Sequence, residues 1–255
     1  MRTNGKLAYG TPFHDIGTAF HLCQGRDMMG KTFSPRPRTN SLSRDRIIAA
    51  SIALLDEHGE TGLTFRGLAK KLSTGAGAIY WHVANKGELL GAACDAIVAP
   101  ALKAPQAGTA PEASIRDLAL KLFDAIDDHP WVGAALMHAP GQLPAVRILE
   151  SLGRSIGALG VPDADRWSTV GALLNYVFGV AGRNASNRQF ARAQGVNRSD
   201  FLKSVSISWL QLDPQTYPFT RSLAADVCAH DDREDFLSGI DLILSGIKKL
   251  ADKLQ

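Results

Sequence analysis

The sequence predicts an all-α protein, and three observations carry this prediction. Apolar residues recur at helical spacings of three and four through most of the chain, as at Ile48, Ile52 and Leu55. Clusters of Gly and Pro separate these periodic segments. No alternation of apolar and polar residues persists long enough to indicate a strand. We therefore expect an N-terminal three-helix domain followed by a larger helical domain.

The chain divides into three parts. Residues 1–40 mix Gly, Pro, Thr, Asn and basic residues without periodicity, so we expect a flexible leader there. Met28 or Met29 can be the true start, and the first 27 residues receive no function. Residues 41–100 carry the first periodic segments. A linker over residues 101–112, rich in Ala, Pro and Gly, opens the second helical domain, residues 101–255.

The first domain begins at Ser43, a good N-cap, and its first helix runs to a stop at His58-Gly59. Thr64 then caps a short helix through Leu72. Ser73-Thr74 offers the next cap directly afterwards, so another short helix follows over residues 75–82. Two short helices across a tight turn are typical of a helix-turn-helix.

The remaining segments are read as helices of ordinary length. One starts after Lys86-Gly87 and ends at Pro100, because proline cannot continue a helix. The later helices are expected at residues 114–128, 131–138, 144–159, 163 to about 186, 199–212, 220–229 and 232–254.

Charge, cysteine spacing and apolar runs limit the partners and cofactors that the sequence allows. The net charge is only +3, but residues 1–100 hold the excess, with 12 Lys and Arg against 8 Asp and Glu. Most of it lies between Lys31 and Arg46, as expected of an arm near phosphates or of a solubilising tail. Cys23, Cys94 and Cys228 show no metal or disulfide spacing. No apolar run suits a signal peptide or a membrane span. We expect a cytoplasmic protein with no cofactor, no metal site and no membrane partner.

The stretch from Leu63 to Lys86 resembles the tetracycline-repressor (TetR) family. The order of Leu68-Ala69, Leu72 and Tyr80-Trp81-His82-Val83 followed by Asn85-Lys86 is specific, and it is similar to the branch of the tetracycline repressors themselves. Residues 236–246, within the last predicted helix, are also similar to this branch, and this likeness is weaker. The resemblance implies a homodimer that binds operator DNA, and a C-terminal domain that binds an effector.

A recognition helix needs side chains toward base edges at its N-terminal half and donors toward phosphates at its rim. Thr74 can offer its hydroxyl and backbone N–H to a phosphate, and Arg66 can reach a guanine edge or a phosphate. Lys86 is a plausible phosphate clamp. The predicted DNA-binding residues are Arg66, Thr74, Gly75, Ala76, Gly77, Ala78, Tyr80, Trp81, His82 and Lys86.

Some of these residues have structural alternatives. Tyr80 and Trp81 can close the core of the small domain, Arg66 can be a solvated helix face, and His82 can cap a helix. The run from Gly75 to Ala78 also lacks the larger polar residues that family members often carry there. We therefore expect few hydrogen bonds from this run to base edges, and the operator sequence cannot be predicted from the amino-acid sequence.

The last helix carries a long apolar seam with steps of four and three, and the helix from Asp163 carries small residues that suit close helix pairing. These two segments are predicted to form a four-helix dimer interface, although they can instead pack within one monomer. The predicted interface residues are Val170, Leu174, Phe236, Ile240, Ile243, Ile247 and Leu250.

An effector site is suggested only loosely by the sequence. Apolar and polar residues of two segments suit a small, largely hydrophobic ligand, with core packing as the alternative. The set of positions needed for a tetracycline and magnesium is not recognised. The predicted ligand-binding residues are Phe123, Trp131, Met137, His138, Asn175 and Phe178.

Two other functions remain as alternatives. The chain can be a DNA-binding regulator that answers to a protein partner, or an activator, without a small molecule. A helical enzyme is a remote alternative, because no catalytic motif organises the residues that would serve it, and no catalytic residue is predicted. Those residues are His129, His138, Asp163, Asp165 and His230.

Overall fold

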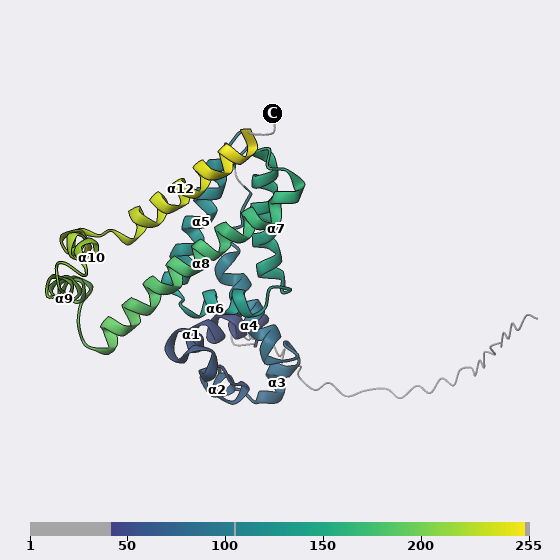
Figure 1. Ribbon diagram of the computed structural model, residues 1–255. Coiled ribbons are helices and arrows are strands. Elements are labelled where there is room, and N and C mark those ends of the chain that lie inside the picture. The colour runs from purple at the N-terminus through teal and green to yellow at the C-terminus, as the bar shows by residue number, and fades with distance from the viewer. Residues whose placement is uncertain (1–41, 105, 253–255) are drawn as a thin grey trace, which may run out of the picture. The chain divides into compact units, whose positions relative to one another are not determined.

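The computed structural model describes residues 42–104 and 106–252, which form twelve α-helices and no strand (Figure 1). The all-α prediction is confirmed. The predicted leader, residues 1–40, lies outside the described residues. From Leu42 onward the chain forms one compact unit. None of the helices in the described ranges combines the length and apolar character needed to cross a bilayer.

Four helices build the N-terminal part: α1 (Arg44–Gly62), α2 (Phe65–Lys71), α3 (Ala76–Tyr80) and α4 (Lys86–Val98). Local caps set their starts, because the side chains of Ser43, Thr64 and Asn85 accept hydrogen bonds from the backbone of the first turns of α1, α2 and α4. Gly59 has a φ of 65° and kinks α1 near its end, where the sequence predicts a stop.

The core of this part is small and mostly apolar, and the buried hydroxyl of Ser51 donates to the carbonyl oxygen of Ile47 at 2.7 Å. Ile47 and Leu55 of α1, Leu68 of α2 and Ile79 of α3 are buried, and Leu89 extends the same core into α4. Helix α4 also packs on α6 (Trp131–His138) and α7 (Leu143–Ala158). The apolar core therefore runs without a break from α1, α2 and α3 into the rest of the unit.

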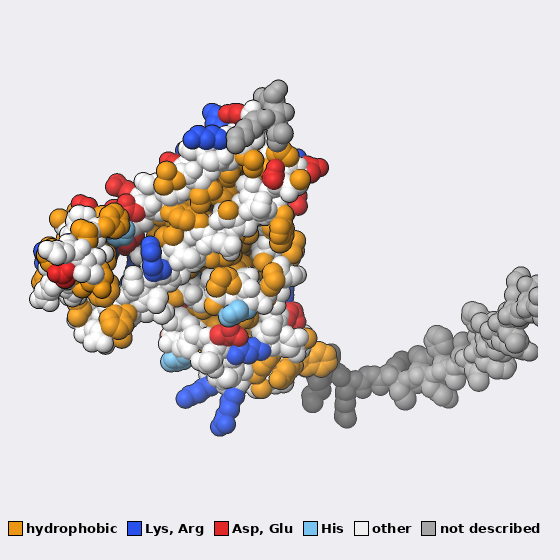
Figure 2. All heavy atoms as spheres, in the orientation of Figure 1, with side chains coloured by type: hydrophobic (Ala, Val, Ile, Leu, Met, Phe, Trp, Pro, Cys, Tyr) orange, Lys and Arg blue, Asp and Glu red, His pale blue; other side chains and the backbone are white. Residues whose placement is uncertain are grey.

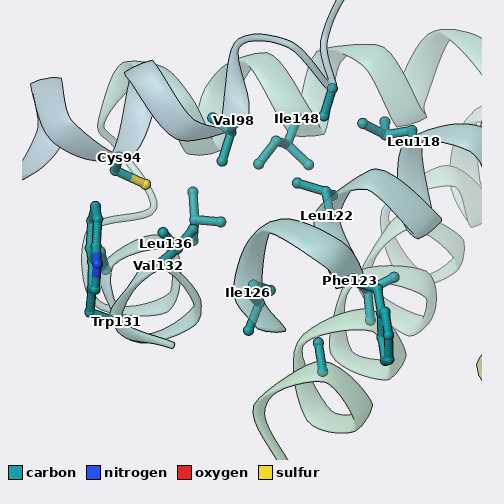
Figure 3. Packing of buried hydrophobic residues seen from close by; sticks show 14 of the residues in the cluster. Cys94, Val98, Leu118, Leu122, Phe123, Ile126, Trp131, Val132, Leu136 and Ile148 are labelled. Carbon is teal, nitrogen blue, oxygen red and sulfur yellow. The ribbon is translucent and has the colours of Figure 1, made fainter. Parts of the chain in front are cut away.

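The larger part is built around α5 (Pro111–Asp128), which packs on α7, α8 (Asp163–Ala193) and α12 (Asp232–Asp252). Figure 3 shows the α5 side chains Leu122 and Ile126 in this core, with Phe123 at one end and Trp131 beside Cys94 at the other. Burial raises the pKa of the Cys94 thiol to about 12, helped by the nearby Asp95 carboxylate. Cys94 is therefore an inert core residue.

Three short helices, α9 (Arg198–Leu210), α10 (Pro218–Ser222) and α11 (Ala224–Ala229), join α8 to α12. They pack mainly on one another, at the ends of α8 and α12 that point away from α7 (Figure 1). Six large apolar side chains in this region and at the end of α8 remain exposed to solvent: Phe190, Val196, Ile207, Leu210, Tyr217 and Phe219.

The predicted dimer seam needs a correction, because most of it lies inside the single chain. Helix α12 turns its apolar seam toward α5 and α8, and the ring of Phe236 stacks on Phe123 with 4.6 Å between ring centroids. Leu174, Ile243 and Leu250 are half-buried against the same core. The predicted interface residues that are buried in the monomer are Val170, Phe236, Ile240 and Ile247.

Candidate nucleic-acid interface

Helices α2 and α3 form the helix-turn-helix, and an aromatic pair holds them together. The rings of Phe65 and Tyr80 stack with 4.3 Å between their centroids and an interplanar angle of 8°. One face of the Tyr80 ring is therefore used in packing, yet the side chain stays 54% exposed. Tyr80 thus combines both roles that the sequence allows, because it closes the small domain and still presents surface to a partner.

Trp81 follows α3 and is 90% exposed, so it does not close the core. Its indole ring is therefore free to make apolar contact with a partner, and its N–H can donate a hydrogen bond. Arg66 and Lys70 lie one turn apart on α2, both are exposed, and neither forms an ion pair with a described residue. Their charges are available to phosphates. The side chains of α2 and the end of α3 thus provide the cations and the apolar contact that a DNA interface needs.

The start of α3 differs from the prediction. Gly75 is the N-cap, without a side-chain cap, and Thr74 lies before it, half-buried, with its backbone N–H donated to the carbonyl of Ala69 at 3.0 Å. The Thr74 backbone N–H is therefore already used. A Cβ placed on Gly75 or Gly77 meets no other atom within 4 Å, so this face of α3 is bare.

Lys86 begins α4 and has a structural bond. Its Nζ donates to the carbonyl oxygen of Glu60 at 2.6 Å, which ties α4 to the end of α1. Two side chains cap the N-terminus of α4, because Asn85 Oδ1 accepts from the Glu88 backbone at 2.8 Å and Glu88 Oε2 accepts from the Ala84 backbone at 2.8 Å. His82 is half-buried beside this turn. The Lys86 ammonium is therefore engaged within the chain in this structure.

Sequence reasoning missed Lys70, although the spacing of four from Arg66 on a short helix was a usable signal. The neighbouring Lys71 differs, because its Nζ donates to Glu57 Oε1 at 2.8 Å and lowers the pKa of that carboxyl. Lys71 therefore supports α1, whereas Lys70 is unengaged among the described side chains.

A polar contact links this interface to the larger helical part. Asp56 of α1 accepts at one oxygen, Oδ1, from Trp131 Nε1 at 2.8 Å, and His129 Nδ1 lies 2.8 Å from the same oxygen. Trp131 is buried at the start of α6. We call these three residues the Asp56 clasp. A second link joins Arg147 of α7 to both carboxylate oxygens of Asp95 on α4, at 2.8 and 3.0 Å.

The structure does not bring the six predicted effector residues into one cavity. Phe123 and Trp131 fill the core at separate places, and Phe178 is half-buried against it. Met137, His138 and Asn175 are exposed.

A cavity of about 790 Å³ lies elsewhere, between the second half of α8, α9, α11 and the start of α12. None of the six predicted residues lines it. Arginines recur along the α8 wall of this cavity, although the sequence alone does not show that they line it. The lining arginines of α8 are Arg183, Arg188 and Arg192.

Two family models match the chain. The model of bacterial regulatory proteins of the tetR family matches residues 47–93, which hold α2, α3 and most of α1 and α4. The model of the tetracyclin repressor-like C-terminal domain matches residues 104–251, more than half of the chain. The match boundaries agree with the division between the short N-terminal helices and the helices that begin at α5.

Individual relatives agree with the family models. The transcriptional regulator SCO7222 from Streptomyces coelicolor, a TetR, is 49% identical, with a TM-score of 0.74 over 83% of this chain and 100% of that one. The HTH-type transcriptional repressor DrrR1 from Streptomyces coeruleorubidus is 27% identical over 85% of this chain and 80% of its own length.

A structure of BioQ with its double-stranded DNA operator is 30% identical, with a TM-score of 0.53 over 74% of this chain and 100% of that chain. The likenesses therefore cover both the helix-turn-helix and the larger helical part. The chain belongs to the tetR family of bacterial regulatory proteins, which are DNA-binding transcription regulators.

Proposed function

We propose that the chain is a repressor that binds a palindromic operator as a homodimer and leaves it when a small molecule binds. The exposed surface around α3 is the observation that carries this proposal. Trp81 is 90% exposed, Arg66 and Lys70 on α2 are exposed and form no ion pair with a described residue, and a Cβ on Gly77 of α3 meets no other atom within 4 Å. Such a surface suits the edge of a major groove, where cations contact phosphates and the short helix approaches the bases. The likeness to BioQ, solved on its operator, supports the same partner.

The bare face of α3 sets what kind of sequence reading is possible. Ala76 and Ala78 offer methyl groups that can contact thymine methyls, and the two glycines let the backbone come close to the DNA. Direct hydrogen bonds to bases then fall to residues at the rim, above all Arg66. Part of the specificity is therefore expected to come from the shape of the DNA.

Homodimerisation is supported by an apolar surface on α8 and α12. Trp167 and Leu242 are 77% and 76% exposed, and a Cβ at Gly171, Gly182 or Gly246 meets no atom within 4 Å. Figure 2 shows hydrophobic side chains gathered over these two helices. Two copies that pair through this surface bury it in a four-helix arrangement. This surface, rather than the buried seam of α12, is the proposed dimer face, with the half-buried Leu174, Ile243 and Leu250 at its base: all three pack against the core.

Release by an effector requires that the larger helical part acts on the recognition helices. A dimer fits a palindrome when its two recognition helices lie about 34 Å apart, so a small tilt of the N-terminal helices removes the fit. The Asp56 clasp and the Arg147–Asp95 pair are the polar links across which such a tilt can be driven. A regulator that answers to a protein partner instead would use the same links.

The test of DNA binding is the salt dependence of affinity for a labelled duplex. Each phosphate contact that is lost lowers the slope of log K against log salt by roughly one. Lys70→Gln is expected to weaken binding to all duplexes alike and to reduce the slope by this amount. Lys248→Gln on α12, which also removes one exposed cation, is the matched control and should change neither. Equal slopes for wild type and Lys70→Gln would overturn the placement of DNA on α2.

A further inference from the structure

The cavity between α8, α9, α11 and α12 has the size and lining of a small-molecule site. Its volume of about 790 Å³ falls in the range of drug-sized ligand pockets. Aromatic rings from three helices face it: Tyr176 of α8, Phe201 and Trp209 of α9, and Phe236 of α12. Tyr176 is held in place because its hydroxyl donates to the carbonyl of Phe236 at 3.1 Å. Flat rings on several sides favour a planar aromatic ligand.

The charged groups of the cavity carry a positive excess, because four arginines and two aspartates line it. Arg198 is used within the protein, since its Nε donates to Asp232 at 2.9 Å and Asp232 also pairs with His230. Arg183 and Arg192 differ. Neither guanidinium has a hydrogen bond or ion pair within the described ranges. Two unpaired guanidinium groups beside aromatic rings favour an anionic group on the ligand.

The fourth arginine connects the cavity wall to α5. Arg188 Nη2 lies 2.5 Å from Asp127 Oδ2, and the Asp127 side chain is only 12% exposed. The other carboxylate oxygen of Asp127, Oδ1, is buried without a hydrogen-bond partner among the described residues. Asp127 therefore depends on Arg188 to stay ionised in the core. Two residues further along the chain, His129 contacts Asp56 of the helix-turn-helix part.

We propose that this cavity binds a planar aromatic molecule carrying one anionic group, which pairs with Arg183 and Arg192 and competes with Asp127 for Arg188. The inference rests on the proposed function, because it supplies the site and the chemistry of the effector. Loss of the Arg188 contact leaves the Asp127 carboxylate unpaired in the core. The end of α5 then shifts, and the Asp56 clasp lies directly after it.

The test uses the anionic aromatic dye 8-anilinonaphthalene-1-sulfonate and the full chain. Saturable binding of one dye per chain is expected, and Arg183→Gln and Arg192→Gln should each weaken it roughly tenfold. Both arginines are exposed, so these variants keep the fold. Lys203→Gln, which removes an exposed cation from α9 outside the cavity lining, is the matched control and should bind as wild type. No saturable binding, or arginine variants equal to this control, overturns the site.

Two further measurements separate the parts of the proposal. The neutral dye Nile red should bind wild type and the arginine variants alike, and an equal loss for both dyes overturns the assignment of an anion. Asp127→Asn should tighten binding of the anionic dye, because Arg188 is no longer shared, and unchanged affinity overturns the competition for Arg188.

Duplex release is read separately, so that the two proposals fail in different ways. Dye that binds through the arginines and leaves the duplex bound supports the site and contradicts effector release. Dye that releases the duplex equally from wild type and both arginine variants supports effector release and overturns this cavity as its site.

Discussion

Tyr80 and Trp81 are neighbours in the sequence, yet they have opposite environments. The Tyr80 ring stacks on Phe65 and holds α3 against α2, whereas Trp81 is almost fully in water. The two side chains point in different directions because Tyr80 is the last residue of α3 and Trp81 is its C-cap. Within this short helix Gly77 has no side chain, whereas the residues at the end of the helix carry large rings. The proposed DNA interface therefore has large side chains at its rim and a bare centre.

Gly77→Ala tests the bare centre. A Cβ at this position meets nothing within 4 Å, so the methyl adds no clash and the helix gains about 0.5–1 kcal/mol of unfolding free energy. The added methyl lies between α3 and the DNA, so affinity and sequence preference should change. Urea unfolding and duplex titration measure the two effects.

Gly153→Ala on α7 is the matched control for this prediction, because its Cβ also meets open space. This variant should stabilise the protein by a similar amount and leave DNA binding unchanged. A Gly77→Ala protein that binds every duplex as wild type does would contradict the placement of this face of α3 against DNA.

Asp127 gives a prediction on pH. Burial raises the pKa of its carboxyl above 3.8, and Arg188 opposes this shift only in part. A carboxyl with a raised pKa in the folded state destabilises that state once it ionises. The unfolding free energy of wild type relative to Asp127→Asn should therefore fall as the pH rises from about 3.8 through the raised pKa. Urea unfolding at several pH values measures this difference, and a rise with pH would contradict it.

At the scale of the helices, the sequence predicts positions well where the signal is local. Ser43 and Thr64 cap α1 and α2 as expected, because a cap depends only on the residues next to it. The prediction fails where the signal depends on distant partners. Helix α8 continues to Ala193, beyond the predicted end near residue 186, although its last turns lack apolar periodicity. A local prediction also fails at α3, whose N-cap is Gly75 rather than Thr74.

The α12 seam shows why the candidate site was only partly predictable. Periodicity shows that Phe236, Ile240 and Ile247 share one face, but not which helix covers it. In the structure the cover is α5 and α8 of the same chain. The residues of the cavity are spread over α8, α9, α11 and α12, so no local pattern joined them in the sequence. The predicted DNA-binding residues all lie within one short stretch, residues 66–86, so a local motif was enough to predict them.

The Asp56 clasp carries a prediction at this scale. Asp56→Ala leaves the indole N–H of the buried Trp131 without its partner, so the unfolding free energy should fall by about 1–3 kcal/mol. The variant should also lose part of the coupling between effector and DNA. Asp117→Ala, which breaks an exposed pair with Lys121, is the control, and it should cost less than about 1 kcal/mol. Equal losses in the two variants would show that the clasp has no special role.

For the whole molecule, the proposed dimer depends on how much apolar surface the single chain leaves exposed. Most of the apolar face of α12 is used within the chain, and what remains outside is the surface around Trp167 and Leu242. That surface lies on α8 and α12, away from α1–α3 in Figure 1. Pairing through it leaves the helix-turn-helix of each copy free. The arrangement suits a dimer that places two α3 helices on one duplex.

Leu242→Glu tests the dimer. A carboxylate in the centre of an apolar interface costs several kcal/mol, so the variant should sediment as a monomer and bind DNA weakly. Leu143→Glu on α7 places the same charge on another exposed leucine and should leave the wild-type sedimentation unchanged. A Leu242→Glu protein that remains dimeric would rule out this face.

We propose that the chain is a dimeric regulator whose α3 helices read a symmetric operator. Selection of bound duplexes from a random pool tests this proposal directly, because symmetry, half-site spacing and specificity appear in one measurement. We predict enrichment of an inverted repeat whose half-sites lie roughly 10 base pairs apart, or a multiple of that spacing. Enrichment of a single half-site without a partner, or no enrichment at all, would contradict it.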